Sequence, residues 1–349
     1  MVDYLIVGLG IAGTNLALTL SEKGHSLALV DDGEFPSSSR IAAGLFNPIT
    51  GVKLLKSWNA SLFFPYLLQH YRKWEQKWNQ KFLYPIGIYV PFENIETQNK
   101  WLGAQHDERY KHFVSSTHNV PLNLPDFENP FGGMFLQPAG FLDINTFLTC
   151  AYSYLAQRHM FIREKLDYTS IKIYSDKIVW NCIEARKLIF SEGQRNYLNP
   201  FFPNLKYHRV KGEILTIYSP NAESIPYVIN KGIWVVPLGN HLYKIGSTYD
   251  NLQRDTIPTE KGKQEILQRF TKMFHWQYTV VEHHAAIRPA TFDRRPFVGL
   301  HTQYKNIGIF NGMGTKGVSM SPYLAEHFYN VLENQVPLMS EINFNRCYT

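Results

Sequence analysis

The chain has 349 residues, of which 44% are hydrophobic, 15% aromatic and only 18% charged. This composition excludes an intrinsically disordered or fibrous protein. A length above the roughly 250–300 residues at which a single core stops growing favours two domains. The formal net charge is +6 without a run of like charges, so the sequence does not indicate nucleic-acid binding.

We expect no secretory leader, since Met1-Val2-Asp3 runs directly into a short apolar segment that Gly8 ends. No apolar stretch approaches the ~18–20 residues of a membrane span. Three widely separated cysteines form no disulfide framework or metal-binding pair, and this suits a reducing compartment. We therefore expect a cytoplasmic protein that uses neither a membrane nor a metal ion.

The first thirty residues predict a strand, a helix and a second strand. Residues 4–7 are apolar, residues 13–23 have the leucine spacing of a helix, and residues 26–30 read Ser-Leu-Ala-Leu-Val. Gly8, Gly10 and Gly13 form a GxGxxG motif where the first strand gives way to the helix. Such glycines permit a tight turn, the approach of a pyrophosphate to the backbone, and close packing of helix on sheet.

Asp31 and Asp32 directly follow the second strand. A carboxylate at this position accepts a hydrogen bond from a ribose hydroxyl, so the segment predicts a dinucleotide-binding unit. The motif does not by itself distinguish FAD from NAD.

Further elements follow with several long excursions between them. The pattern predicts a helix from Pro65 to about Phe82, a helix over 144–157 and a strand over 187–191 that leads to Gly193. Residues 210–248 are strand-like, residues 259–274 helical, and a strand at 307–310 precedes a glycine loop and a last helix to about Glu333. We expect an α/β fold in which a doubly wound, Rossmann-like domain (residues 1–83, 141–210 and 286–349) is interleaved with a mixed β-sheet substrate domain (84–140 and 211–285).

Three later segments carry a resemblance to a known family: residues 37–45, 288–299 and 311–319. Together with residues 211–213 and 245–248, and in this order along nearly the whole chain, they resemble the FAD-dependent oxidoreductases of the D-amino acid oxidase and glycine oxidase family. The resemblance implies FAD as the cofactor. It also implies that the 312–317 loop faces the pyrimidine edge of the flavin, where Lys316 and free N–H groups would stabilise the anionic reduced ring.

The cofactor-binding positions predicted by the motif and the resemblance together are numerous. They are Gly8, Gly10, Ile11, Ala12, Gly13, Asp31, Asp32, Ser38, Ser39, Arg40, Ala42, Ala43, Gly44, Leu45, Phe46, Gly193, Gly312, Met313, Gly314, Thr315, Lys316 and Gly317.

Arg288 is the main substrate-binding candidate, because its counterpart in the family grips the substrate carboxylate and a guanidinium binds a carboxylate with two parallel bonds. Family members often have a tyrosine where this chain has Trp234, whose indole has only an N–H donor, so a glycine-sized substrate is disfavoured. Tyr249, Asn47 and Lys53 are further candidates for the pocket. The alternative for Arg288 is a structural ion pair, and the alternative for Lys53 and Tyr249 is ordinary solvent exposure.

The resemblance implies oxidation of the C–N bond of a carboxylate-bearing amine, an amino acid or an N-substituted glycine, by hydride transfer to flavin N5. Oxygen or another acceptor would then take up the electrons. Three alternatives stay open: oxidation of a 2-hydroxy acid, oxidative trimming of a carboxymethylaminomethyl-type modified tRNA base, and a non-catalytic FAD-binding scaffold. An open basic trough would favour a macromolecular substrate, and a narrow closed cavity a free amino acid.

Overall fold

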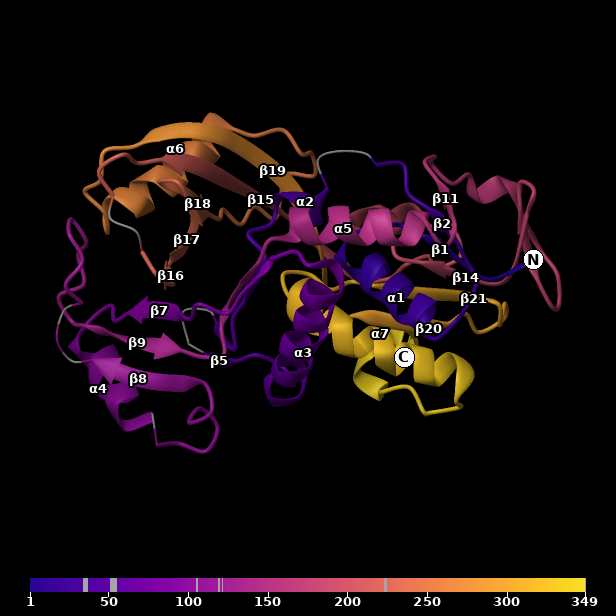
Figure 1. Cartoon of the computed structure of the whole chain (residues 1–349), viewed down its shortest axis with the longest axis horizontal. Helices are drawn as coiled ribbons and strands as arrows, with labels where there is room; N and C mark the ends of the chain where they lie inside the picture. Colours follow the sequence, from indigo (N-terminus) through magenta and orange to yellow (C-terminus); the bar gives the residue numbers. More distant parts are fainter. Residues whose placement is uncertain are drawn as a thin grey trace.

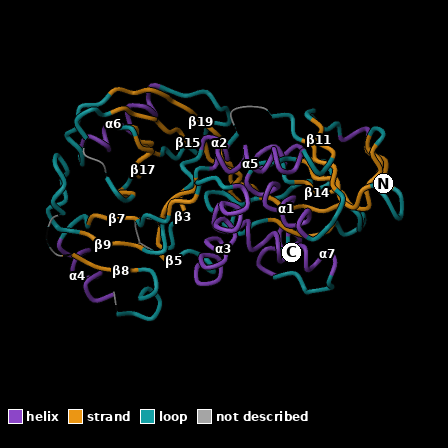
Figure 2. The backbone as a smooth tube through the Cα atoms, viewed as in Figure 1, coloured by secondary structure: helices purple, strands orange, loops and turns teal. Residues whose placement is uncertain are grey.

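The computed structural model describes residues 1–33, 37–50, 55–104, 106–118, 120, 122–222 and 225–348. Lys53, one of the predicted pocket residues, lies outside these ranges. Two large sheets organise the described chain, with helices gathered beside one of them (Figure 1, Figure 2).

The first sheet contains the predicted βαβ unit. Its central strands run in the order β11-β2-β1-β14, with β21 also beside β14, and these neighbours are parallel. Strands β13, β12 and β20 extend it with antiparallel pairs. The strands are β1 (Val2–Val7), β2 (Leu27–Val30), β11 (Met160–Ile162), β12 (Ile171–Ile173), β13 (Ile178–Trp180), β14 (Ile183–Phe190), β20 (Phe297–Leu300) and β21 (Ile307–Asn311).

Helices cover this sheet, as a doubly wound fold requires. Helix α1 packs against α5 and α7, and α7 packs against α3. These helices are α1 (Ile11–Glu22), α3 (Ala60–Trp78), α5 (Ile144–Ala156) and α7 (Gly317–Glu333). Helix α1 is buried on nearly every side, which explains its apolar and small residues.

Helix α3 begins at Ala60, so the prediction that it starts at Pro65 was wrong. Proline favours the first turn of a helix, but Pro65 lies inside α3. Buried contacts of Ala60, Phe63 and Phe64 extend the helix toward its N-terminus and outweigh the hydrogen bond that the proline cannot make. The same helix buries Trp74 completely, so this indole is part of the core.

The second sheet runs in the order β19-β15-β18-β17-β16-β7-β9-β8 and is mixed, because β16 and β7 are parallel while the other neighbours are antiparallel. Helix α6 packs against β15, β17 and β18. These elements are β7 (Ile88–Pro91), β8 (Val114–His118), β9 (Gly133–Leu136), β15 (Tyr207–Tyr218), β16 (Val228–Lys231), β17 (Ile233–Gly239), β18 (Leu242–Gly246), β19 (Thr279–Thr291), α4 (Ile95–Ala104) and α6 (Glu260–Thr271).

The remaining elements are short. They are α2 (Ser38–Ile41), β3 (Leu45–Phe46), β4 (Ile49–Thr50), β5 (Leu55–Lys56), β6 (Leu83–Tyr84), β10 (Gly140–Leu142) and the 3₁₀ turns at Tyr168–Ser170, Gly193–Leu198, Ser340–Ile342 and Phe344–Cys347. Strands of the first sheet thus alternate along the sequence with strands of the second. Strand β19 crosses the boundary expected at residue 286, and the domain limits stay a prediction.

Within the described residues no helix is both long and apolar enough to span a membrane.

Candidate active site

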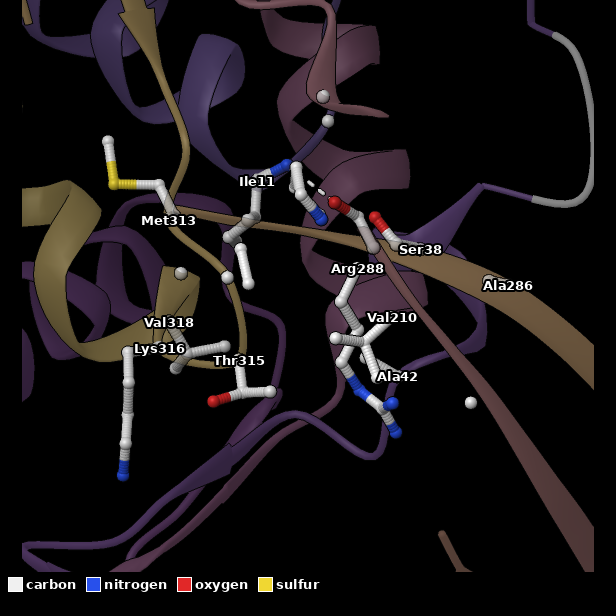
Figure 3. A pocket seen from close by; sticks show the side chains of 18 of the residues that line it. Ile11, Ser38, Ala42, Val210, Ala286, Arg288, Met313, Thr315, Lys316 and Val318 are labelled. Carbon is white, nitrogen blue, oxygen red and sulfur yellow. Dashed lines mark hydrogen bonds between the residues drawn. The ribbon is translucent and has the colours of Figure 1, made fainter. Parts of the chain in front are cut away.

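A cavity of about 1840 Å³ lies where the two sheets approach each other (Figure 3). Segments far apart in the sequence line it: the glycine turn after β1, the end of β2, helix α2, strands β15, β17, β18 and β19, and the loop before α7. Pockets for one drug-sized ligand usually measure about 300–1,000 Å³. This cavity therefore has room for a large ligand together with a smaller one.

The glycine turn forms one end of the cavity. Gly8 has φ +90°, and a Cβ on it would lie 2.5 Å from the carbonyl oxygen of Ser191, so only glycine fits here. Gly10 lines the cavity with bare backbone. The N–H of Ile11, at the start of α1, donates to the Ser39 hydroxyl over 3.0 Å (dashed in Figure 3). Backbone N–H groups and a hydroxyl at a helix N-terminus suit a phosphate.

Asp31 lines the cavity beside this turn. Its carboxylate accepts from the N–H of Leu9 over 2.6 Å and from the N–H of Gly33 over 2.9 Å. Asp31 therefore fixes the turn and still has lone pairs for a ligand hydroxyl. Neighbouring Asp32 forms an ion pair with Arg195.

Strand β3 and the residues before it form the floor of the cavity. Residues 42–45 line it, and Asn47 lines it with a side chain that is only 4% exposed. Phe46 does not line the cavity, because successive side chains of a strand point to opposite faces. Its ring is buried against Phe64, so the structure does not bring Phe46 to the site as expected. Gly13 also stays out of the lining and allows α1 to pack closely on the sheet.

Arg288 projects into the cavity from β19 (Figure 3). Its Nη2 donates to Ser247 Oγ over 2.7 Å, its Nη1 donates to the carbonyl of Thr248 over 3.3 Å, and the guanidinium lies 4.4 Å from the ring centre of Tyr249. Burial lowers the pKa of Arg288, while nearby Tyr249 acts in the opposite direction. No acidic side chain among the described residues pairs with this guanidinium, so it is held in place yet free to bind an anion.

Two buried charges fix the segment that holds Arg288. Lys211 has no exposed surface, and its ammonium donates to Asp255, Gln253 and the carbonyl of Ile257 over 2.6–2.7 Å. Glu213 accepts from Thr259 and contacts a histidine ring nitrogen, His283 Nε2, at 2.8 Å. Both carboxylate and ammonium lie on the face of β15 opposite Gly212, which faces Arg288.

The other predicted substrate residues also reach the cavity. Trp234 lines it from β17, and Tyr249 lines it just after β18 with 65% of its surface exposed. Neither Ser247 nor Thr248 was assigned a role from the sequence, although the segment containing them contributed to the resemblance. Ser191 lines the cavity too and was not predicted from the sequence. Its position at the end of β14, beside β1 in the parallel sheet, is the signal that could have found it.

The loop before α7 closes the cavity on a further side. Residues 312–317 all line it, and Gly193 lines it nearby with a carbonyl that accepts from Asn311 over 2.9 Å. Lys316 is half-buried, and its ammonium donates to the carbonyl of Asn47 over 3.1 Å. Burial lowers the pKa of Lys316 to about 8. Except for Gly13 and Phe46, every predicted site residue that the structure describes lines this one cavity.

The lining suits a dinucleotide. Bare backbone at Gly10, the N-terminus of α1 and the Ser39 hydroxyl lie together at one end, and the buried Ser191 hydroxyl there has no hydrogen-bond partner within the described residues. A family model described as FAD dependent oxidoreductase matches residues 3–330. The chain belongs to this family.

Solved structures share the fold of this oxidoreductase over almost its full length. Glycine oxidase from Geobacillus kaustophilus has a TM-score of 0.83 at 17% identity and covers 99% of this chain and 98% of its own. Glycine oxidase from Bacillus cereus has a TM-score of 0.81 at 19% identity, covering 97% and 96%. Iminodiacetate oxidase from Chelativorans has a TM-score of 0.82 at 16% identity, covering 98% and 99%. The expected α/β fold, with a Rossmann-like domain beside a mixed-sheet domain, is confirmed.

The relatives found by sequence are described as tRNA-modification proteins, unlike the oxidases with a similar fold. The tRNA 5-methylaminomethyl-2-thiouridine biosynthesis bifunctional protein of Marinobacter nauticus is 22% identical over 93% of this chain, and that of Legionella pneumophila is 26% identical over 84%. The aligned regions cover 54% and 45% of those two proteins, so the chain spans about half the length of these relatives.

Proposed function

We propose that this FAD-dependent oxidoreductase binds FAD in the described cavity and oxidises the C–N bond of an amine that carries a carboxylate. The substrate class is an N-substituted glycine or another amino acid. The family, the fit of the glycine turn to a dinucleotide and the free guanidinium of Arg288 support the proposal.

The residues that would hold FAD come from three segments. The glycine turn and Ser39 would bind the pyrophosphate, Asp31 the ribose, and residues 42–45 and the backbone of residues 312–317 would surround the ring. Bound FAD supplies two-electron oxidation of the substrate. The protein's own contribution is to hold the amine in one orientation and to shield it from water.

Arg288 is the observation that carries the proposal. A guanidinium has five N–H donors, and contacts with Ser247 and Thr248 use two of them. The remaining donors have no carboxylate partner within the described chain, and the guanidinium occupies the space that the missing side chain of Gly212 creates. Two parallel bonds to a carboxylate would then fix the position of the amine and of the carbon next to it.

The test begins with the absorption spectrum of the purified protein, which should show bound flavin. Anaerobic addition of N-methylglycine, N-ethylglycine and other carboxylate-bearing amines should bleach the flavin bands. Matched amines without the carboxylate should not, and 2-hydroxy acids should react poorly. A protein that cannot be loaded with FAD, or whose flavin no such amine reduces, would disprove the proposal.

A second candidate substrate is a carboxymethylamino group carried by tRNA, the kind of molecule named in the descriptions of the curated relatives. Eleven basic and five acidic side chains line the cavity, and this excess of positive charge favours a substrate that carries phosphates. Three of the five acids, Asp31, Asp32 and Glu192, lie near the dinucleotide end. The basic ones are Arg40, Lys56, Lys165, Arg195, Lys231, Arg269, Lys272, Arg288, Arg294, Arg295 and Lys316.

Salt dependence distinguishes this candidate from a small amine. If several of these side chains contact phosphates, the affinity for bulk tRNA should fall steeply between about 50 and 200 mM salt. A gel shift with bulk tRNA measures it, and the Lys231→Ala/Lys272→Ala double variant should reduce the slope. Absence of binding at low salt would exclude a tRNA-borne substrate and leave the small amine.

A further inference from the structure

Two further cations line the cavity on a wall separate from Arg288. Lys316 and Ser57 both donate to the backbone carbonyl of Asn47, each over 3.1 Å. The next residue after Ser57 is Trp58, and the guanidinium carbon of Arg295 lies 4.6 Å from the centre of its ring. These contacts connect Lys316 to Arg295 through Asn47, Ser57 and Trp58, and all five residues line the cavity.

Neither cation has a carboxylate partner within the described part of the chain. The acidic residue nearest to Arg295 in sequence, Asp293, accepts two bonds from Arg346 at 2.7 and 3.1 Å. Burial lowers the pKa of both Arg295 and Lys316. Asp293 and Glu341 act in the opposite direction on Arg295 without reversing its shift, so neither positive charge is fully compensated. An anionic ligand would provide that compensation.

The two groups of donors come from different elements. Arg288 is held by residues that follow β18, whereas Lys316 directly precedes α7 and Arg295 precedes β20. In Figure 3 the side chains of Arg288 and Lys316 extend in the same direction, away from Ile11 and the glycine turn. Arg288 and Lys316 therefore point away from the phosphate-binding end of the cavity.

We propose that Lys316 and Arg295, with Ser57 and Trp58, form a second anion-binding subsite, and that the substrate is an amine with two anionic groups. Arg288 binds the carboxylate next to the reacting carbon, and the second subsite binds a carboxylate or a phosphate at the end of the N-substituent. Lys316 uses only one of its three N–H donors on Asn47. The apolar edges of Trp58 and Phe63, with ring centres 5.2 Å apart, suit the methylene groups of the linker. This inference rests on the proposed function and narrows its substrate class.

Unreactive thioethers test it without turnover. Thiodiacetate replaces the amine nitrogen of a dicarboxylic amine with sulfur, and methylthioacetate has only one carboxylate. Calorimetric titration of the FAD-loaded protein should show thiodiacetate, or its analogue with one phosphonate, binding at least tenfold more tightly than methylthioacetate. The better of the two dianions identifies the second group as a carboxylate or a phosphate.

Single substitutions test which side chains cause the preference for a dianionic probe. Lys316→Met and Arg295→Met should remove most of the tenfold preference and change methylthioacetate binding less than threefold, whereas Arg288→Met should weaken both probes. Arg158→Met is the matched control, since Arg158 stacks on Tyr154 at 3.9 Å outside the cavity lining. Equal affinity for all probes, or equal losses for one and two charges, would overturn the second subsite while leaving Arg288 and the proposed function intact. Absence of binding by every probe would overturn both.

Should the variants fail to fold, the parent protein alone still decides the question. Flavin reduction by iminodiacetate should then be at least tenfold more efficient than reduction by N-ethylglycine, a substrate of similar length without the second charge. Equal efficiency would contradict the second subsite.

Discussion

A Cβ atom on Gly212 would overlap the Nη2 atom of Arg288. The two residues lie on neighbouring antiparallel strands, where Val210 is paired with Arg288 and Gly212 with Ala286. The absence of a side chain at Gly212 therefore creates the space that the guanidinium occupies. Gly212, which contributed to the family resemblance without an assigned role, thus determines where Arg288 lies in the cavity.

Gly212→Ala should weaken substrate binding by roughly tenfold or more without loss of FAD. The added methyl group would displace the guanidinium, which can move because it is the end of a flexible side chain, and this would break the bond to Ser247. Steady-state KM and the flavin-to-protein absorbance ratio measure the two effects. Gly103→Ala is the control, because nothing lies within 4 Å of that position. An unchanged KM would show that Arg288 does not contact substrate.

Arg288→Ala should leave the protein folded and loaded with FAD, because the proposed FAD contacts lie elsewhere. Substrate affinity should fall by about 1.5–3 kcal/mol, the range for a hydrogen bond to a charged group, or by about 10- to 150-fold. Arg288→Lys should recover only part of this loss, since an ammonium cannot form two parallel bonds. As a contrasting variant, Asp31→Ala should weaken the binding of FAD and not of substrate, and flavin release on dilution measures this effect. Turnover of every amine at the parent rate by Arg288→Ala would make the residue purely structural.

The sequence was sufficient to predict the βαβ unit because its signals are local. Gly8, Gly10 and Gly13 act within one turn, and the flanking strand and helix follow directly in the chain. Arg288 and the 312–317 loop came from a resemblance to a family, and the structure brings them to the same cavity.

Contacts between distant strands could not be predicted in the same way. Ser247 and Arg288 are 41 positions apart, and their contact depends on the pairing of β15 with both β18 and β19. The burial of Lys211 depends on a loop more than 40 residues away. Phe46 was misplaced because a shift of one position along a strand reverses the face of a side chain. Of the residues that connect Lys316 to Arg295, Asn47 was assigned to the site from the sequence, whereas Ser57 and Trp58 were not.

His70 should make stability depend on pH. Its Nε2 lies 2.8 Å from Asn15 Oδ1 inside the helix layer, and burial lowers its pKa from 6.5 to about 3. Between these values the unfolded chain binds a proton that the folded protein excludes, so stability is full above pH 6.5 and falls as the pH drops toward 3. The complete loss amounts to at most about 5 kcal/mol.

The measurement is chemical denaturation at pH 7 and pH 5. His70→Gln keeps an N–H donor for Asn15 but cannot take up the proton, so its free energy of unfolding should decrease less over this interval than that of the parent. His208→Gln, an exposed histidine, should behave as the parent does. A parent-like decrease in His70→Gln would show that other groups cause the acid sensitivity.

Lys316 should make the binding of a dianionic ligand depend on pH above neutrality. Burial lowers the pKa of its ammonium to about 8, so the free protein loses this positive charge as the pH rises through that value. The guanidinium groups of Arg288 and Arg295, which also face the cavity, keep their charge over the same range. Below pH 8 the affinity for thiodiacetate should be constant, and above it the affinity should fall by up to tenfold per pH unit, because binding then requires uptake of a proton.

Methylthioacetate should bind with the same affinity from pH 7 to 9.5. Lys316→Arg should abolish the slope while keeping tight binding, and Lys316→Met should bind weakly at every pH. Calorimetry across this range measures all four profiles, and a parent slope that persists in Lys316→Arg would assign the titration to another group.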